Sequence, residues 1–108
     1  MPLKRDIALD ALYNGVEESL RLEAAAYWTE QSCLPFTTTV ICTPADLDIP
    51  KTVVVTLKDK VFPKDLQVLC AEKWGAKMTE IDFGHSPWMN DPERALLVEL
   101  IEQEASRI

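Results

Sequence analysis

Residues 52–57 read TVVVTL, a continuous run rich in β-branched side chains that follows Pro50. Such a run is typical of a strand covered on both faces, as in a parallel sheet. The polar turn KDK at residues 58–60 ends it. We therefore take this run as the first strand of a parallel sheet.

A helix is predicted next. Pro63 is suited to a first helical turn, and Gly75 is suited to the position where a helix stops. Between them the apolar side chains have helical spacing and predict a buried stripe. The stripe comprises Leu66, Leu69, Cys70 and Trp74.

A second short strand is predicted over residues 78–82, followed by a loop at 83–87 and a last helix. Asp91 is a plausible N-cap of that helix, with Pro92 at its first position. Its expected apolar face consists of Leu96, Leu97, Leu100 and Ile101. The order strand, helix, strand, helix predicts an α/β fold with right-handed βαβ connections and a short parallel sheet.

The N-terminal half has a different character. Apolar residues at three- and four-residue steps predict a helix over residues 3–12, and a second one is expected over 16–30. Prolines and threonines then make the chain irregular up to residue 50. We expect one compact unit with two parts, a helical segment at 1–50 and an α/β core at 51–108.

Composition excludes several classes. The 108 residues carry 11 basic and 18 acidic side chains, a net charge of −7, so a nucleic-acid partner is not expected. No apolar run approaches the roughly 20 residues of a membrane span, and no signal peptide is expected. Three cysteines at irregular spacing fit reduced thiols better than a disulfide framework or a zinc site. We expect no metal and no cofactor.

Two polar residues lie just beyond the carboxyl ends of the predicted strands, where functional side chains gather in such a fold. Asp59 follows the first strand and His85 follows the second. A carboxylate there can accept the Nδ1 proton of the imidazole and leave Nε2 free as a general base. The alternative is that both are ordinary solvated loop residues.

The segments DIPKTVVVTLKDK (48–60), with Pro63 and Gln67 after it, and IDFGHSPW (81–88), with Pro92-Glu93 after it, resemble the C-terminal end of the α/β-hydrolase superfamily. The subgroup is the one of plant methylesterases, hydroxynitrile lyases and fungal hydrolases. Upstream, the stretches at 12–16, 31–32 and 36–38 resemble its cap segment, although Gly15 stands where the subgroup often has Asp. The resemblance implies a partial hydrolase fold in which Asp59 and His85 are two members of a catalytic triad.

The third member of that triad has no counterpart here. The family's nucleophile sits in a Gly-x-Ser-x-Gly elbow, and the three glycines, Gly15, Gly75 and Gly84, form no such motif. Ser86 adjoins His85 and would need an unusual geometry, and Ser19 and Ser32 lie in no motif. Of the thiols, Cys42 and Cys70 are possible substitutes, with inert packing expected for Cys70. The chain therefore resembles only the last part of a full-length member.

The last three residues, Ser106-Arg107-Ile108, resemble the peroxisomal tripeptide Ser-Lys-Leu and predict a peroxisomal import receptor as a partner. Together with the fungal-type features they resemble the hydrolases of host-selective toxin biosynthesis, the AK-, AF- and ACT-toxin group. That resemblance implies secondary metabolism, a peroxisomal location and an apolar acyl substrate.

Three functional hypotheses follow. The first is a hydrolase-type protein acting on an ester, thioester or related carbonyl, with the nucleophile supplied by water or a partner chain. The second is a non-catalytic remnant or interaction module that associates with itself or with a full-length hydrolase, because an open sheet edge and an uncovered apolar face are expected. The third is a lyase-like or isomerase-like proton shuttle on the Asp59–His85 pair.

Overall fold

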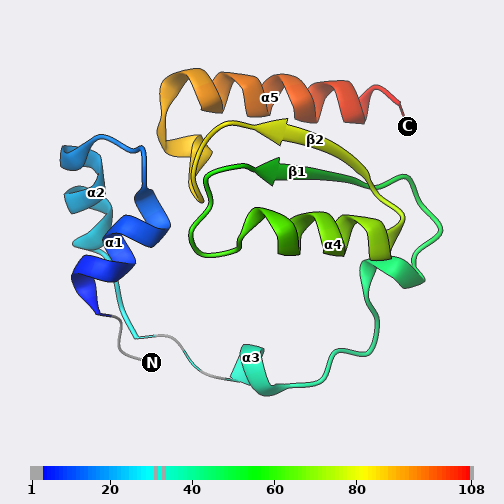
Figure 1. The fold of residues 1–108 in the computed structure, drawn as a ribbon, viewed down its shortest axis with the longest axis horizontal. Helices are drawn as coiled ribbons and strands as arrows, with labels where there is room; N and C mark the ends of the chain where they lie inside the picture. Colours follow the sequence, from blue (N-terminus) through cyan, green and yellow to red (C-terminus); the bar gives the residue numbers. More distant parts are fainter. Residues whose placement is uncertain (1–3, 31, 33, 108) are drawn as a thin grey trace.

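The computed structural model describes residues 4–30, 32 and 34–107, and within them the chain is a mixed α/β protein (Figure 1). A two-stranded parallel sheet pairs β1 (Thr52–Thr56) with β2 (Lys77–Ile81). Figure 1 shows α4 (Lys64–Trp74) along one side of the strands and α5 (Asp91–Ala105) along the other. The predicted order of strand, helix, strand, helix is confirmed at this level.

The sheet register brings the carboxyl ends of the two strands together. Thr52 lies opposite Lys77 and Thr56 lies opposite Ile81. The ladder continues past β1, since the Leu57 N–H donates to the Ile81 carbonyl at 3.0 Å. The loops that leave both strands therefore start at the same edge.

Helix α4 ends where the sequence predicts, because Gly75 adopts the left-handed conformation with φ of 65°. Its buried face differs from the predicted stripe. The buried residues are Gln67 and Ala71, whereas Leu66 and Leu69 remain 46% and 45% exposed. Ala71 is fully buried, so the covered face of α4 is the one that carries this small side chain and Gln67.

Helix α5 covers the opposite face through a small core. Ile81, Phe83 and Val16 are buried there, and Leu97 and Leu100 of the helix pack against them. The other two residues of the predicted apolar face, Leu96 and Ile101, stay 40% and 67% exposed. The N-cap is Asn90, so the helix begins one residue earlier than predicted, with Asp91 in its first turn.

The N-terminal helices are α1 (Arg5–Tyr13) and α2 (Glu18–Ala25). Helix α2 is shorter than the predicted span of residues 16–30, and Val16 lies in the core instead of in the helix. Gly15, with φ of 87°, makes the turn that delivers Val16 to the core. Tyr13 and Trp28 hold this unit together, because the indole N–H donates to the Tyr13 hydroxyl at 2.9 Å.

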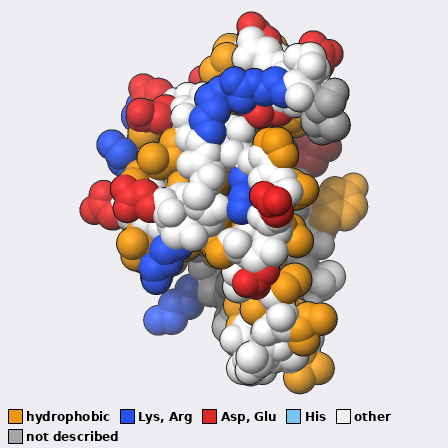
Figure 2. Space-filling model, turned by 90° about the vertical axis from the view of Figure 1, so that its right-hand side faces the viewer, with side chains coloured by type: hydrophobic (Ala, Val, Ile, Leu, Met, Phe, Trp, Pro, Cys, Tyr) orange, Lys and Arg blue, Asp and Glu red, His pale blue; other side chains and the backbone are white. Residues whose placement is uncertain are grey.

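Residues 34–50 run along the periphery, with a short helix α3 (Leu34–Thr37) and a 3-10 turn at Pro44–Asp46. The radius of gyration is 15.6 Å, against about 13 Å for a compact domain of this length. Figure 2 shows hydrophobic side chains exposed among charged ones on the side where α5 ends. The fold is therefore more open than one closed core would give.

Candidate functional site

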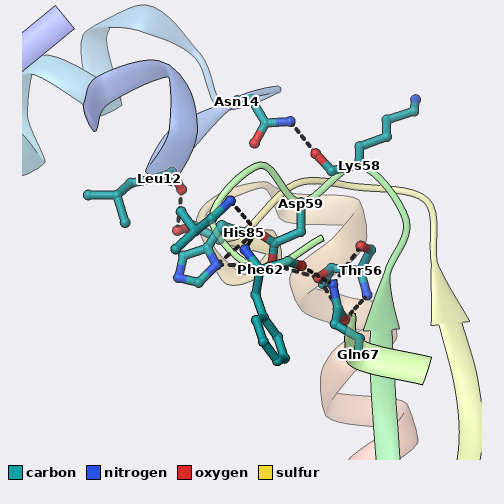
Figure 3. Close-up of polar contacts among 10 residues, drawn as sticks. Leu12, Asn14, Thr56, Lys58, Asp59, Phe62, Gln67 and His85 are labelled. Atoms are coloured by element: carbon teal, nitrogen blue, oxygen red, sulfur yellow. Dashed lines mark hydrogen bonds and ion pairs between the residues drawn. The ribbon is translucent and has the colours of Figure 1, made fainter. Parts of the chain in front are cut away.

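Asp59 lies in the turn after β1, where main-chain and side-chain donors surround its carboxylate (Figure 3). Oδ1 accepts from the N–H groups of Val61 and Phe62 at 2.8 and 2.9 Å. Oδ2 accepts from the Thr56 hydroxyl at 2.9 Å. The side chain is only 5% exposed. A buried carboxylate with this many donors is held in one orientation.

Two opposing effects set the pKa of Asp59. Burial raises it, because removing the carboxylate from water disfavours its charge. The hydrogen bonds from Phe62, His85, Thr56 and Val61 favour the charged form and together outweigh burial. The pKa of Asp59 is therefore lowered from its ordinary value, and the group is ionised at neutral pH.

His85 lies in the loop after β2, with Nδ1 at 3.0 and 3.1 Å from the two carboxylate oxygens of Asp59. An ionised carboxylate can only accept a hydrogen bond, so Nδ1 is the nitrogen that carries the proton. Among residues 4–30, 32 and 34–107, no side chain or main-chain group bonds Nε2. The imidazole is 32% exposed. The structure thus brings Asp59 and His85 together and leaves the Nε2 lone pair available.

The loop that carries His85 is fixed from both sides. The Lys58 N–H donates to the Phe83 carbonyl at 2.9 Å and joins the two strand exits. The Ser86 side chain, 2% exposed, donates to the Leu12 carbonyl at 2.7 Å and joins the loop to α1. Because its hydroxyl is buried in this bond, Ser86 has a structural role and is not placed to attack a substrate.

Helix α1 ends against the same loop. Asn14 donates through Nδ2 to the Lys58 carbonyl at 2.8 Å. A Cβ built on Gly84 would lie 2.1 Å from the Asn14 Oδ1 atom and 2.6 Å from its main-chain oxygen. Gly84 is therefore required for the close approach of the N-terminal segment to the site.

The described residues supply no obvious nucleophile or metal ligand set. Cys42 is exposed and Cys70 is half-buried on α4, and Cys33 lies outside the described residues. No group of three His, Cys, Asp or Glu side chains that could hold a metal is found in the described part of the chain. Within the described residues, the Asp59–His85 pair has the geometry to move a proton.

An apolar groove of about 600 Å³ lies away from the pair. Its lining comes from the residues that lead into β1, from the sheet and from the end of α5, including Ile49, Pro50, Val54 and Leu100. Asp59 and His85 do not line it. The groove and the Asp59–His85 pair are therefore separate features of the surface.

Ser106 and Arg107 follow the end of α5 and are exposed, and Ile108 lies outside the described residues. The Ser106 hydroxyl donates to the Gln103 carbonyl at 2.7 Å, and Arg107 is paired with Glu104 at 3.4 Å. Recognition of this tripeptide by a peroxisomal receptor stays a prediction.

No protein-family model matches this sequence, no curated protein matches it, and no solved structure matches its fold. The resemblance to α/β-hydrolases therefore stays a prediction. Separately, no helix in the described ranges is long and apolar enough to cross a membrane.

Sequence reasoning gave no role to one buried polar residue near the pair, Gln67. It is 5% exposed and its amide bonds the end of β1. The signal that could have identified it is its spacing of four residues from Ala71, which places both on one face of α4. A polar side chain on a buried helix face requires partners, and here the partners are in the site.

Proposed function

We propose that this chain carries the acid–base part of a hydrolase-type site, with His85 as the general base and Asp59 as the residue that orients it. The observation that supports this proposal is the contact between His85 Nδ1 and the Asp59 carboxylate, which leaves the lone pair of His85 Nε2 available. A buried anion beside Nδ1 stabilises the imidazolium that forms when Nε2 accepts a proton.

The proposed reaction is hydrolysis of an ester or thioester of an apolar acyl group. His85 Nε2 takes a proton from water, the resulting hydroxide adds to the carbonyl carbon, and the alcohol or thiol leaves with the proton. The resemblance to fungal hydrolases supports this substrate class, and the chemistry of the pair supports the proton transfer.

The test is hydrolysis of acyl p-nitrophenyl esters and acyl thioesters by the purified chain. His85 is the single histidine of the sequence, so its replacement removes every imidazole. We expect His85→Ala to lose about 10²-fold or more of the turnover. Asp82→Ala is the matched control, because Asp82 is an exposed residue of the same loop region. Equal turnover by wild type and His85→Ala would refute the proposal.

A second proposal is an association role, favoured by the apolar groove beside β1. The groove is bordered by apolar residues of the sheet and α5 that a partner chain could cover. Sedimentation of the purified chain, alone and mixed with a full-length hydrolase, tests it. A monomer in both experiments, with no turnover of any ester, would contradict both proposals.

A further inference from the structure

Gln67 of α4 has a side-chain amide whose nitrogen and oxygen both bond the main chain, at the end of β1 or in the turn after it. Nε2 donates to the carbonyls of Thr56 and Phe62 at 3.1 and 2.6 Å. Oε1 accepts from the Thr56 N–H at 2.9 Å and lies 3.2 Å from the Thr56 hydroxyl. The single proton of the Thr56 hydroxyl goes to Asp59 Oδ2, so main-chain groups fill three of the four bonding positions of the amide, both N–H donors among them.

These contacts also fix which way the amide points. If the oxygen and nitrogen were exchanged, the oxygen would face two carbonyls and the nitrogen would face an N–H. Both arrangements lack a hydrogen bond and are repulsive. The buried environment, with Gln67 5% exposed, makes an unpaired amide costly. One orientation is therefore selected.

The two segments that Gln67 joins are those that hold Asp59. Thr56 donates its hydroxyl to Oδ2, and Phe62 donates its N–H to Oδ1. Val61, the third donor, directly precedes Phe62. Figure 3 shows Gln67 on the strand side of this cluster and His85 on the opposite side of Asp59. In the described part of the chain, no hydrogen bond joins Gln67 to Asp59 or to His85.

At Phe62 the turn is held by two hydrogen bonds, from its N–H to Asp59 and from Gln67 to its carbonyl. Val61 and Phe62 are 45% and 40% exposed, so burial stabilises their position only in part. The bond to the Phe62 carbonyl, made by Gln67, keeps the adjoining N–H groups aimed at the carboxylate.

We infer that Gln67 is the positioning residue of the Asp59–His85 pair, acting by clamping the end of β1 to the end of the turn that surrounds the carboxylate. This inference deepens the proposed function. It predicts that Asp59 loses donors when the clamp is removed, although Gln67 is not itself one of the donors described for the carboxylate.

The experiment compares Gln67→Met with Gln103→Met, because both replace an amide by a thioether of similar length. Gln103 is an exposed residue of α5 whose amide bonds only Glu99 among the described residues. The readout is titration of the Asp59 carboxyl carbon by NMR, which needs no turnover. We expect the pKa of Asp59 to rise toward its ordinary value in Gln67→Met and to stay unchanged in Gln103→Met. An unchanged Asp59 titration in a folded Gln67→Met protein would overturn the inference.

A second measurement uses the wild-type protein, in case the variant does not fold. Hydrogen exchange of the side-chain amide is compared between Gln67 and Gln103. We expect the Gln67 amide protons to exchange at least about tenfold more slowly. Equal exchange would overturn the inference.

Activity separates this inference from the proposed function. If His85→Ala shows that the chain is a hydrolase, Gln67→Met should lower kcat by about tenfold with little change in KM, and loss confined to KM would contradict the positioning role. If no ester is hydrolysed, the Asp59 titration still decides the role of Gln67.

Discussion

Replacing Asp59 by Asn tests the electrostatics of the site with minimal change in shape. Oδ1 receives the Val61 and Phe62 N–H groups, so the amide oxygen of Asn must remain on that side. The new NH₂ group then faces the Thr56 hydroxyl and His85 Nδ1. To bond this donor, Nδ1 must give up its proton, and Nε2 becomes the protonated nitrogen.

The stability lost in Asp59→Asn follows from the number of hydrogen-bond donors that lose a charged acceptor. A hydrogen bond to a charged group contributes about 1.5–3 kcal/mol, and a neutral one contributes about 1 kcal/mol. Three donors other than His85 bond the carboxylate at 2.8–2.9 Å. Each loses roughly 0.5–2 kcal/mol, and relief of the burial of the charge offsets part of the sum, so Asp59→Asn should lower the free energy of unfolding by about 2 kcal/mol at neutral pH.

The stability lost in Asp59→Asn should become smaller as the pH falls. The pKa of Asp59 is lowered from 3.8 by its hydrogen bonds. Its stabilising effect is therefore complete above the ordinary carboxyl value and is lost as the pH falls through the lowered value. The difference between wild type and Asp59→Asn should shrink as the solution is acidified below 3.8.

Urea unfolding followed by tryptophan fluorescence, at neutral and at acid pH, measures the loss in the free energy of unfolding and its dependence on pH. Asp82→Asn is the control, because the Asp82 carboxylate is 70% exposed and forms a surface ion pair with Lys58 at 3.4 Å. We expect it to cost less than about 0.5 kcal/mol. Equal losses in the two variants, or a loss in Asp59→Asn that does not change with pH, would refute this reasoning.

Two further variants test how α1 is joined to the site, with urea unfolding as the assay. Gly84→Ala should lower the free energy of unfolding by about 1–3 kcal/mol, because the new Cβ meets Asn14. Gly75→Ala is the control, because the space around it is open. It should lower the free energy of unfolding by only about 1–2 kcal/mol, for the left-handed backbone, and should leave α1 in place. Limited proteolysis distinguishes the two glycine variants. If the N-terminal segment resists cleavage equally in both, the close approach of Gly84 to Asn14 is contradicted. Ser86→Ala should cost about 1–3 kcal/mol, since it leaves the Leu12 carbonyl without its donor, and an unchanged midpoint would count against that bond.

Local patterns in the sequence predict the frame of the fold. The β-branched run, the position of Gly75 and the spacing of apolar residues are local signals, and they place β1, α4, β2 and α5. The parallel arrangement then implies that residues after the two strands meet, and Asp59 and His85 do lie in contact. Their catalytic role stays a prediction.

Features that depend on long-range packing could not be predicted in this way. The buried face of α4 is set by Ala71 and Gln67, because a small side chain and a polar side chain with partners in the turn fit there better than the larger Leu66 and Leu69. Val16 is buried by residues more than sixty positions away, Ile81 and Phe83. No short window of sequence around Val16 contains these partners.

The position of the proton on the neutral His85 ring is the sharpest test of the Asp59–His85 pair. Nitrogen NMR of the labelled protein at neutral pH distinguishes a proton on Nδ1 from a proton on Nε2 in the neutral imidazole. We expect the Nδ1–H form in wild type, because the Asp59 carboxylate accepts that proton, and the Nε2–H form in Asp59→Asn. An Nε2–H form in wild type would contradict this expectation, since Nε2 of His85 would then have no free lone pair for a general base.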